Sequence, residues 1–571
     1  MTTGTSPGQT VYGEKIWSIM VYLAGGRDIS GEARESLLQM KQVGSTENVN
    51  VIAQFDSGSE GTFTKRYHLK PLKNAIGIQT LLRKACLEVP ALSNPSDSTV
   101  GKYYYQRLVD ILPEDHGKKF QNRYPQGEMI DLLKYDPARF KNSVLDFILD
   151  QDLDKEDGNQ GDTNAGDPKV LVEFVHWAKE KYRSKHTMVI IWGHGSGLSV
   201  AWDFPASPLV GSKDSLAVRE LSDAVGALPA TRNSEHGPKR DVKSSHKIDI
   251  LGFNSCSLGT IEVYRQLKDL VHFGVASEGF TPRTSWPFDK ILKALNERIG
   301  MSPKEFTRTI VAKYVDHYKG SVEAAAQLRL AERQLGIEGL GTGLDLNKGP
   351  DLGQGKGPDL GQAKGPDLGQ GKGPDLAAAK GPDLGAAKGP DLGPLGDRGR
   401  RGVDLSACDL DRSLEVTEEM KSLVRLLRAK LEGKVNRNVL GAILAAHSIG
   451  QSYFNKDFTD LHDFCRALES FCSDRKIRDA CRKVRQAIEA MCYKRESVGD
   501  DVRNSIGISI YFPWGDWEEN DARYREKDFM FLADTEWNKF LSKYRALVNA
   551  FEKEPFKPVA VIEEAKRKSA S

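Results

Sequence analysis

Residues 189–198 read VIIWGHGSGL, a stretch that indicates both a fold class and a position for chemistry. Four apolar residues lead directly into His194, which has a glycine on each side. A short, continuous apolar run is typical of a strand buried on both faces, as in a parallel sheet. The two glycines remove side-chain bulk and permit positive φ, so the backbone of another molecule can approach the imidazole. His194 is therefore a candidate functional residue at a strand end.

The rest of the chain repeats this pattern of buried strands that alternate with helices. Such alternation predicts an α/β fold with a mostly parallel central sheet between layers of helices. In such sheets the ligand site lies at the carboxyl ends of the strands. His194 follows one strand end, and Cys256 follows another. Strands are predicted at 17–24, 49–56, 187–192, 248–253 and 271–277, and helices at 30–43, 167–182 and 258–270.

Length and composition exclude several classes of protein. The 571 residues suffice for several domains, and 81 Lys and Arg against 79 Asp and Glu leave a net charge of +2. This balance gives no reason to expect a nucleic-acid partner. No window approaches the roughly 18 apolar residues of a membrane span, and the N-terminal residues lack the layout of a secretory signal. Seven cysteines, an odd number, indicate reduced thiols and not a disulfide framework. We therefore expect a cytoplasmic protein.

The chain divides into segments of different composition. Residues 14–330 are predicted to form the α/β core, with a polar, loop-rich insertion at 70–160. In 331–402, KGPDL occurs six times at an eight-residue period, which is too short for a solenoid unit. The Gly and Pro content, with one Leu in each repeat, predicts a disordered tether instead of a folded repeat. Residues 403–555 are predicted to form a helical C-terminal part, which contains one returning strand at 503–513. Residues 556–571 are predicted to be a frayed tail.

Cys256 differs from the other cysteines because it follows an apolar strand and is expected to stand directly before a helix. The positive end of a helix dipole and a nearby imidazolium both favour the thiolate. Cys256 and His194 at adjacent strand ends would form a nucleophile–base pair. HGSG also resembles the oxyanion loop of lipases, but the required G-x-S-x-G elbow is absent. We expect a satisfied, semi-buried side chain at His447 and inert packing thiols, with no metal site, at Cys86, Cys408, Cys465, Cys472 and Cys481.

At these residues the chain resembles the clostripain family of cysteine peptidases, which share the caspase-like fold with caspases, gingipains, legumain and separase. IIWGHGSGL matches the family's apolar strand that ends in H-G-x-G. LGFNSCSLGTIEVYRQL matches its strand–D-x-C–helix segment except at one position. The segments IWSIMVYLAG, VASEGF, SACDL, ISIYFP and TEWNKFLSKY follow in the family's order. The resemblance covers residues 15–69, 163–320 and 403–545 and implies a caspase-like α/β/α sandwich.

The resemblance implies a cysteine endopeptidase that works through a thioester acyl-enzyme. Cys256 would be the nucleophile and His194 the group that transfers protons. The backbone N–H groups of Gly195 and Cys256 would form the oxyanion hole. The alternative is a catalytically inactive caspase-like module that binds peptides or acts as a scaffold, because the substrate pocket departs from the family pattern.

That departure lies two residues before the cysteine, where the family's S1 aspartate is replaced by Asn254. A neutral amide makes weaker hydrogen bonds to a guanidinium than a carboxylate does, so the preference for basic P1 residues is expected to weaken. Glu278, beside Ser277 at the next strand end, is a candidate for restoring a carboxylate. Asn254, Ser277 and Glu278 are therefore the predicted S1 residues.

The family matures by cleavage between its histidine and its cysteine, which implies processing in the polar loop 230–245. The segment GDRGRRG at 396–402 offers a second cleavage site. Calcium is implied as a family trait alone, since no ligand set can be identified, and the chemistry requires no cofactor. We expect a peptide or protein substrate, no membrane partner, and a monomer or, after processing, two associated chains. Candidate P1 residues for processing are Arg232, Lys239, Arg240 and Lys243.

Overall fold

The computed structural model describes residues 12–57, 63–91, 97–203, 214–227, 247–335, 402–453, 457–514 and 524–553. The predicted processing loop, the frayed tail and nearly all of the predicted tether lie outside the described residues. Within the described part, no helix is long and apolar enough to cross a membrane.

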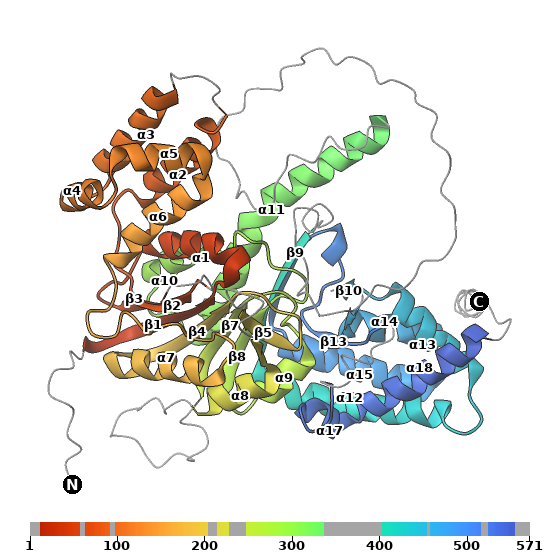
Figure 1. The fold of residues 1–571 in the computed structure, drawn as a ribbon. Coiled ribbons are helices and arrows are strands. Elements are labelled where there is room, and N and C mark those ends of the chain that lie inside the picture. The colour runs from red at the N-terminus through yellow and green to blue at the C-terminus, as the bar shows by residue number, and fades with distance from the viewer. Residues whose placement is uncertain are drawn as a thin grey trace, which may run out of the picture.

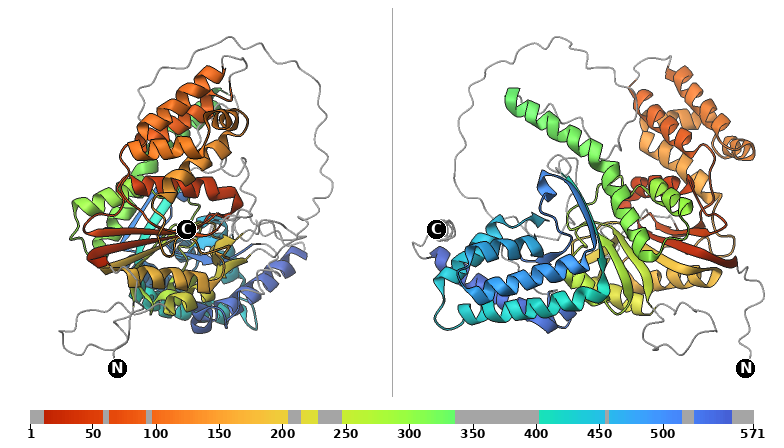
Figure 2. Two further views of the ribbon diagram at one scale, coloured as in Figure 1. Left: turned by 60° about the vertical axis from the view of Figure 1, so that its left-hand side comes forward. Right: turned by 180° about the vertical axis from the view of Figure 1, so that it is seen from behind.

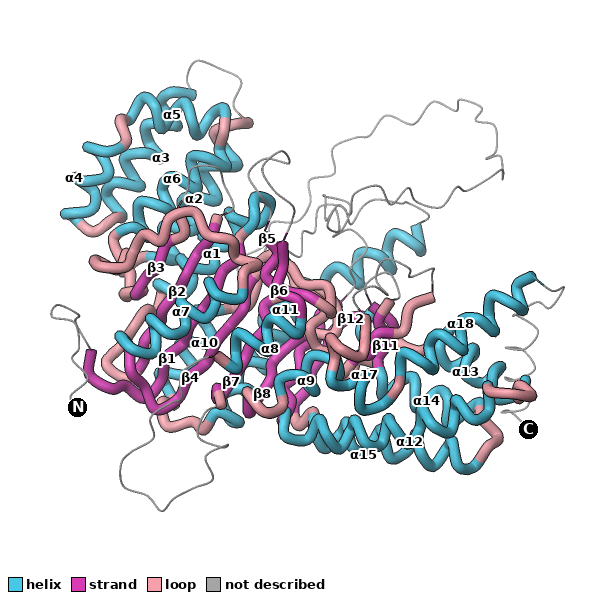
Figure 3. Tube along the Cα trace, turned by 60° about the horizontal axis from the view of Figure 1, so that its bottom comes forward, coloured by secondary structure: helices cyan, strands magenta, loops and turns pink. Residues whose placement is uncertain are grey.

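An eight-stranded sheet forms the centre of the molecule, in the order β12-β9-β8-β7-β4-β1-β2-β3. The five strands from β8 to β2 run parallel, whereas β3 pairs antiparallel with β2, β9 with β8, and β12 with β9. Figure 3 shows β8, β7, β4, β1, β2 and β3 side by side in this order. The predicted mostly parallel sheet is confirmed. Its strands are β1 (Tyr12–Ala24), β2 (Val49–Asp56), β3 (Lys65–His68), β4 (Tyr182–Trp192), β7 (Ile248–Asn254), β8 (Val271–Ala276), β9 (Gly402–Asp409) and β12 (Lys494–Gly499).

Both faces of the sheet are covered by helices, as the side chains of β1 illustrate, because they alternate between two core clusters. Ile19, Val21 and Leu23 belong to one core cluster, and Met20 and Tyr22 belong to the other. Successive side chains of a strand point to opposite faces, so a continuous apolar run fits a strand between two helical layers. Figure 1 shows α1 and α10 on one side of the sheet and α7 and α8 on the other. The first layer comprises α1 (Gly26–Lys41), α10 (Phe288–Glu297) and α11 (Pro303–Leu335), and the second α7 (Pro168–Lys181), α8 (Val218–Gly226) and α9 (Ile261–Leu267).

The insertion predicted to be rich in loops is helical, which corrects that expectation. Ile78, Leu82, Ala85 and Val89 recur at helical spacing and are buried in a separate core cluster. The polar composition of the segment concealed this short amphipathic pattern. The helices pack on α1 through α6, where Arg34 Nε lies 2.7 Å from Asp146 Oδ1. They are α2 (Ala75–Glu88), α3 (Asp97–Ile111), α4 (Glu114–Arg123), α5 (Gln126–Tyr135) and α6 (Pro137–Asp150).

The C-terminal part contains more strands than the single returning strand predicted. It supplies β9 and β12 to the main sheet, and β10 (Ser452–Tyr453), β11 (Phe458–Asp460) and β13 (Ser509–Tyr511) form a small antiparallel sheet. β12 was missed because KRESVG is a polar edge strand without an apolar pattern. Figure 2 shows the C-terminal helices and the inserted helices at opposite ends of the main sheet. The C-terminal helices are α12 (Ser413–Leu431), α13 (Arg437–Ile449), α14 (Leu461–Phe471), α15 (Arg475–Met491), α17 (Met530–Thr535) and α18 (Trp537–Lys553).

The prediction of reduced thiols throughout is wrong for one pair of cysteines. A disulfide joins Cys408 on β9 to Cys492, which precedes the neighbouring strand β12. The pairing of β9 with β12 brings these positions together across 84 residues of sequence, a proximity that spacing does not reveal. The other five cysteines are unbridged.

Candidate functional site

The carboxyl ends of three adjacent strands define the candidate site. In β1, β4 and β7, the residues Leu23, Trp192 and Asn254 lie on one rung of the sheet. His194 and Cys256 each stand two residues beyond this rung, so they emerge at the same edge. The N–H of Gly193 donates to the Asn254 carbonyl oxygen at 3.3 Å and ties the two strand ends together.

Glycines are required where the histidine loop meets its neighbours. Gly193 has φ +147°, and a Cβ there would lie 2.7 Å from the carbonyl oxygen of Ala24 at the end of β1. A Cβ on Gly195 would lie 2.7 Å from the carbonyl oxygen of Cys256. Since real Cβ atoms do not approach backbone oxygens this closely, the two glycines let the histidine loop rest on both neighbouring strand ends.

Cys256 does not stand at a helix N-terminus, which corrects the sequence prediction. The following helix, α9, begins only at Ile261 and is capped by Thr260, whose hydroxyl accepts the N–H of Val263. Ser257, with φ +58°, reverses the chain directly after the cysteine. Thr281 instead brings both backbone groups to the sulfur: its N–H donates to Cys256 Sγ at 3.4 Å, and its carbonyl oxygen lies 3.9 Å from Sγ. The N–H donor favours the thiolate, as the helix dipole was expected to do, and the carbonyl oxygen can accept from the thiol.

One cleft contains both predicted reactive residues. His194 and Cys256 line it together with side chains from the loop that follows β8. Cys256 is 8% exposed, so the thiol is shielded from solvent while it still borders the cleft. We call this the candidate cleft; its lining residues include Trp192, His194, Asn254, Cys256, Thr281, Arg283 and Ser285.

Asp28 contacts the histidine and was not anticipated from the sequence. Its carboxylate oxygens lie 3.0 and 3.1 Å from Nε2 of His194, and Arg283 Nη2 lies 3.5 Å from the same carboxylate. Burial alone would raise the pKa of Asp28, but His194 and Arg283 outweigh it and lower the pKa below its ordinary value. Asp28 stands in the first turn of α1, just beyond β1, so position after a strand end was the available signal.

Asn254 lies in the cleft as the S1 prediction requires, and its amide is held in one orientation. Its Nδ2 donates to Ser285 Oγ, which also accepts the indole N–H of Trp192 at 2.8 Å. Asn254 is 4% exposed, and its Oδ1 has no hydrogen-bond partner among the described residues. Of the residues that the structure describes, no Asp or Glu lines the cleft.

Ser277 and Glu278 do not line the candidate cleft. Both are fully buried beside Asp404, which accepts the Ser277 hydroxyl at 2.9 Å and the Glu278 N–H at 2.7 Å. Glu278 Oε1 accepts the N–H of Gly507, and Asp460 lies close enough for its charge to act on Glu278. Burial first, and then the charges of Asp460 and Asp404, raise the pKa of Glu278 well above its ordinary value. We call Glu278, Asp404 and Asp460 the buried carboxylate cluster.

Of the side chains expected to be inert, Cys86 is partly buried and the others are buried. His447 stacks between Phe512 and Trp514, and its Nε2 contacts the Phe512 carbonyl oxygen at 2.8 Å. Burial lowers the pKa of His447 to about 3, so this imidazole is neutral. Burial raises the pKa of the Cys86 thiol to about 11. Cys465, Cys472 and Cys481 are buried without a disulfide.

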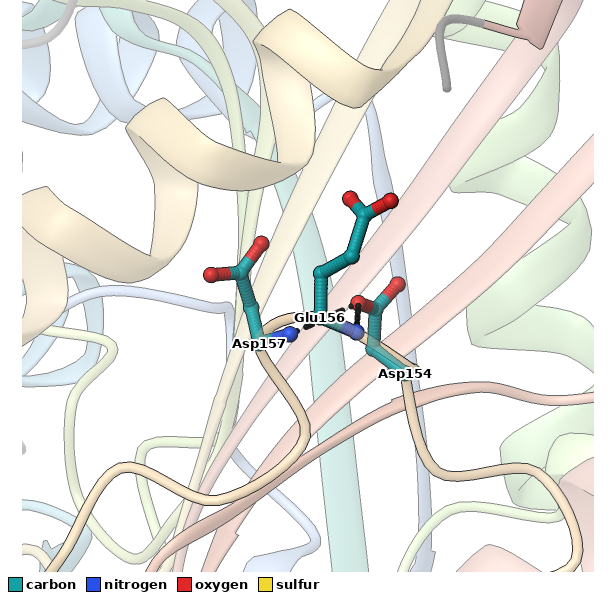
Figure 4. Close-up of side chains that lie close together, drawn as sticks. All are labelled: Asp154, Glu156 and Asp157. Atoms are coloured by element: carbon teal, nitrogen blue, oxygen red, sulfur yellow. Dashed lines mark hydrogen bonds between the residues drawn. The ribbon is translucent and has the colours of Figure 1, made fainter. Parts of the chain in front are cut away.

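An acidic cluster provides a test for the calcium implied by the resemblance. Asp154, Glu156 and Asp157 bring carboxylate oxygens within 4.8 Å of one another (Figure 4). The ammonium of Lys181 lies 2.8 Å from Asp154 and 3.0 Å from Glu156. Because the buried ammonium of Lys181 already pairs with Asp154 and Glu156, the cluster does not fit a calcium site. The backbone N–H groups of Glu156 and Asp157 also donate to Asp154 (Figure 4).

The fold and the site together define an α/β/α protein with a cysteine and a histidine at adjacent strand ends. Comparison with known proteins relates part of the chain to one family. Residues 135–337 match the model Peptidase_C11, described as the clostripain family, and this segment contains both His194 and Cys256. Residues 135–337 are thus similar to the clostripain family, which agrees with the resemblance found in the sequence.

Individual relatives match with low identity. The chain is 26% identical to clostripain of Hathewaya histolytica over 117 residues, which are 19% of each protein. A secreted C11 cysteine protease from Bacteroides thetaiotaomicron in complex with an irreversible peptide inhibitor is 12% identical, with a TM-score of 0.49. An inactive zymogen C11 protease from Parabacteroides distasonis is 11% identical, with a TM-score of 0.48. Each of these two structural matches covers 92% of this chain and 99% of the other.

Proposed function

We propose that the chain is a cysteine endopeptidase with Cys256 as nucleophile and His194 as its proton-transferring partner. The observation that carries this proposal is the candidate cleft, which both residues line while the Thr281 N–H donates to Cys256 Sγ. Further support comes from the family match over the segment that contains both residues. A thiol, an imidazole and backbone donors at one cleft are the groups that acyl transfer requires.

The reaction proceeds in two steps. The Cys256 thiolate attacks the carbonyl carbon of the scissile bond and forms a tetrahedral oxyanion, which the N–H groups of Gly195 and Cys256 stabilise. The C–N bond then breaks, His194 protonates the leaving amine, and a thioester remains. Water, deprotonated by His194, attacks the thioester and releases the acid and the thiolate. An oxyanion donor of this kind contributes about 10²–10³ in rate, and the acid–base group about 10²–10⁴.

Active-site labelling tests this proposal against the inactive binding module. A peptide acyloxymethyl ketone should alkylate Cys256 in the wild type, with much slower labelling in His194→Ala and none at this residue in Cys256→Ala. Both variants should stay folded by circular dichroism and lose peptide hydrolysis. If the folded wild type neither reacts with the reagent nor cleaves a peptide library, the binding module is the better description.

The P1 side chain is proposed to be selected by hydrogen bonding and not by charge. Support comes from Asn254, whose buried Oδ1 borders the cleft without a partner. An unpaired buried acceptor favours a substrate side chain that brings an N–H, and a neutral amide supplies one without the desolvation cost of a cation. The wild type should therefore cleave after Gln or Asn at least as well as after Arg or Lys. Measurement of kcat/KM on four matched P1 substrates tests this.

Two further expectations remain proposals with direct tests. Cleavage in the loop 230–245, after Arg232, Lys239, Arg240 or Lys243, would separate His194 from Cys256 into two associated chains. Intact-mass measurement during activation tests it, and a single uncut chain in the active enzyme would exclude it. The second expectation is a cytoplasmic location, which fractionation of cells that express the full chain tests. Recovery of the protein with a cytoplasmic marker would support it, and recovery in the culture medium would oppose it.

A further inference from the structure

The imidazole of His194 has a carboxylate on one of its two nitrogens. Both oxygens of Asp28 lie within 3.1 Å of Nε2. We propose that Asp28 is a positioning residue, which holds the His194 ring through Nε2 so that Nδ1 exchanges the proton with Cys256 and the leaving amine. This inference rests on the proposed function, and it adds a third side chain to the pair found from the sequence.

The topology of the sheet makes this arrangement specific. β1, β4 and β7 are neighbours, and the segments after their carboxyl ends carry Asp28, His194 and Cys256 respectively. The turn after β1 is fixed because the N–H of Gly25 donates to the Asp56 carbonyl oxygen at 2.8 Å. α1 begins at once, and Ile29, which is 6% exposed, anchors its first turn in the lining of the cleft. The backbone therefore presents Asp28 to the ring from an ordered position.

The surrounding charges favour an ionised carboxylate opposite the imidazole. On α1, Asp28 and Glu32 both face Arg283, whose Nη2 and Nη1 each lie 3.5 Å from one of them. Glu32 has the Lys141 ammonium as a further cationic partner. The further cation that acts on Asp28 is His194, so the negative charge of Asp28 is balanced by His194 as well as by Arg283. The group that gains from this balance is the imidazolium that pairs with the Cys256 thiolate.

A purely structural role for Asp28 makes a different prediction. An acidic residue in the first turn stabilises a helix through the macrodipole, an effect that is screened by solvent and does not depend on His194. Removal of the carboxylate would then lower thermal stability and leave catalysis unchanged. Glu32 lies one turn further along the same helix and also pairs with Arg283, but no contact to the imidazole is found, so it is a matched control.

The kinetic test compares Asp28→Asn, Asp28→Glu and Glu32→Gln in the full chain. We expect kcat of Asp28→Asn to fall about 10–100-fold, the range typical of a residue that orients another, with KM within about twofold. Asp28→Glu should recover part of this loss, and Glu32→Gln should stay near the wild type. A kcat within twofold of the wild type in folded Asp28→Asn would overturn the inference.

Alkylation by iodoacetamide separates failure of this inference from failure of the proposed function, because it requires no peptide turnover. The rate at Cys256 is measured against pH, with His194, Asp28, Glu32 and Arg283 as the charged groups around the site. In Asp28→Asn, the rate at pH 6 should fall about tenfold, equivalent to one pH unit in thiolate formation, and the rate at pH 10 should be unchanged. Superimposable pH profiles for the two proteins would overturn the role of Asp28 even if the chain cleaves no peptide.

Discussion

Carboxylates lie on both sides of Cys256, and their partners differ in charge. Asp28, at the outer side, contacts an imidazole and lies near a guanidinium, and the pKa of Asp28 is lowered despite burial. In the buried carboxylate cluster on the inner side, burial and the charges of two other acids raise the pKa of Glu278. The ionised form of the carboxyl group is therefore favoured on the outer side, and the protonated form on the inner side.

The two regions act on the cysteine through different parts of the chain. Asp28 contacts His194 directly, whereas Asp404 holds the loop that follows β8 by accepting the N–H groups of Glu278 and Gly279. The Gly279 carbonyl oxygen in turn accepts the N–H of Ser257 at 2.8 Å, next to the nucleophile. The outer region is thus expected to control proton transfer, and the inner region the shape of the site.

We expect the largest effect on stability from Asp404→Ala, which removes the hydrogen-bond acceptor of the inner region. The substitution leaves the Ser277 hydroxyl and the N–H groups of Glu278 and Gly279 without their acceptor in the interior. Each such loss costs about 1–3 kcal/mol, and relief of repulsion with Glu278 offsets part of it. We expect the free energy of unfolding in urea to fall by about 3 kcal/mol or more. Asp404→Asn, which keeps one acceptor oxygen, should lose less; equal stability of all three proteins would contradict this account.

Gly195→Ala tests the contact between the histidine loop and the cysteine loop. The added Cβ would meet the Cys256 carbonyl oxygen at 2.7 Å, so one loop must shift. A displacement of about 1 Å at a reacting group can cost about 100-fold in rate, and we expect a loss of that size in kcat/KM with the fold retained. At Gly300 nothing lies within 4 Å of an added Cβ, so Gly300→Ala is the control and should be fully active. Equal activities for the two variants would show that the loops tolerate separation.

Local patterns in the sequence were sufficient to predict the strands that carry the site. Residues 49–56 were predicted as a strand and form β2, and the strand predicted at 248–253 is β7 (Ile248–Asn254). Continuous β-branched runs identify buried strands because they pack against two layers at once. The placement of His194 and Cys256 at one edge followed, since parallel strands end together.

Features that depend on the order of the strands in the sheet could not be predicted from local sequence patterns, whereas the start of α9 could have been. Asp28 precedes His194 by 166 residues, and nothing in its surroundings indicates that β1 lies next to β4. The late start of α9 did have a signal, because Gly259 and then Thr260, a residue preferred as N-cap, stand before Ile261. Ser277 and Glu278 were placed in the cleft by resemblance, but whether they face the cleft or the interior depends on Asp404, which is distant in sequence.

Asn254→Asp introduces a carboxylate into the lining of the candidate cleft, where no Asp or Glu stands among the described residues. Charge-assisted hydrogen bonds are about twice as strong as neutral ones, so an Arg side chain at P1 should gain relative to Gln. We expect the ratio of kcat/KM for Arg over Gln to rise about tenfold, corresponding to about 1.4 kcal/mol. Strict Arg specificity in the wild type that Asn254→Asp leaves unchanged would show that another residue selects P1.

We expect the smallest effects from Glu278→Gln and Asp28→Asn, whose melting temperatures relative to the wild type should change with pH in opposite directions. The folded protein raises the pKa of Glu278, so the wild type loses stability as pH rises from the ordinary range of a glutamate towards the raised value. Gln keeps an acceptor for the Gly507 N–H and does not ionise. The variant should therefore match the wild type near pH 5 and melt about 2 °C or more higher near pH 8.

For Asp28 the dependence of stability on pH has the opposite sign, because the pKa of Asp28 is lowered in the folded protein. Its contribution is present above the ordinary range of an aspartate and is lost as pH falls through the lowered value. Asp28→Asn should therefore melt below the wild type near pH 8, and the gap should close as the pH approaches 3. Thermal melts of the three proteins between pH 3 and pH 9 measure both trends. Because solvent screens the half-exposed Asp28 and not the buried Glu278, the gap for Asp28 should shrink in high salt while that for Glu278 persists. If each variant differs from the wild type in melting temperature by the same amount at every pH, the pKa values of Asp28 and Glu278 are not shifted in opposite directions.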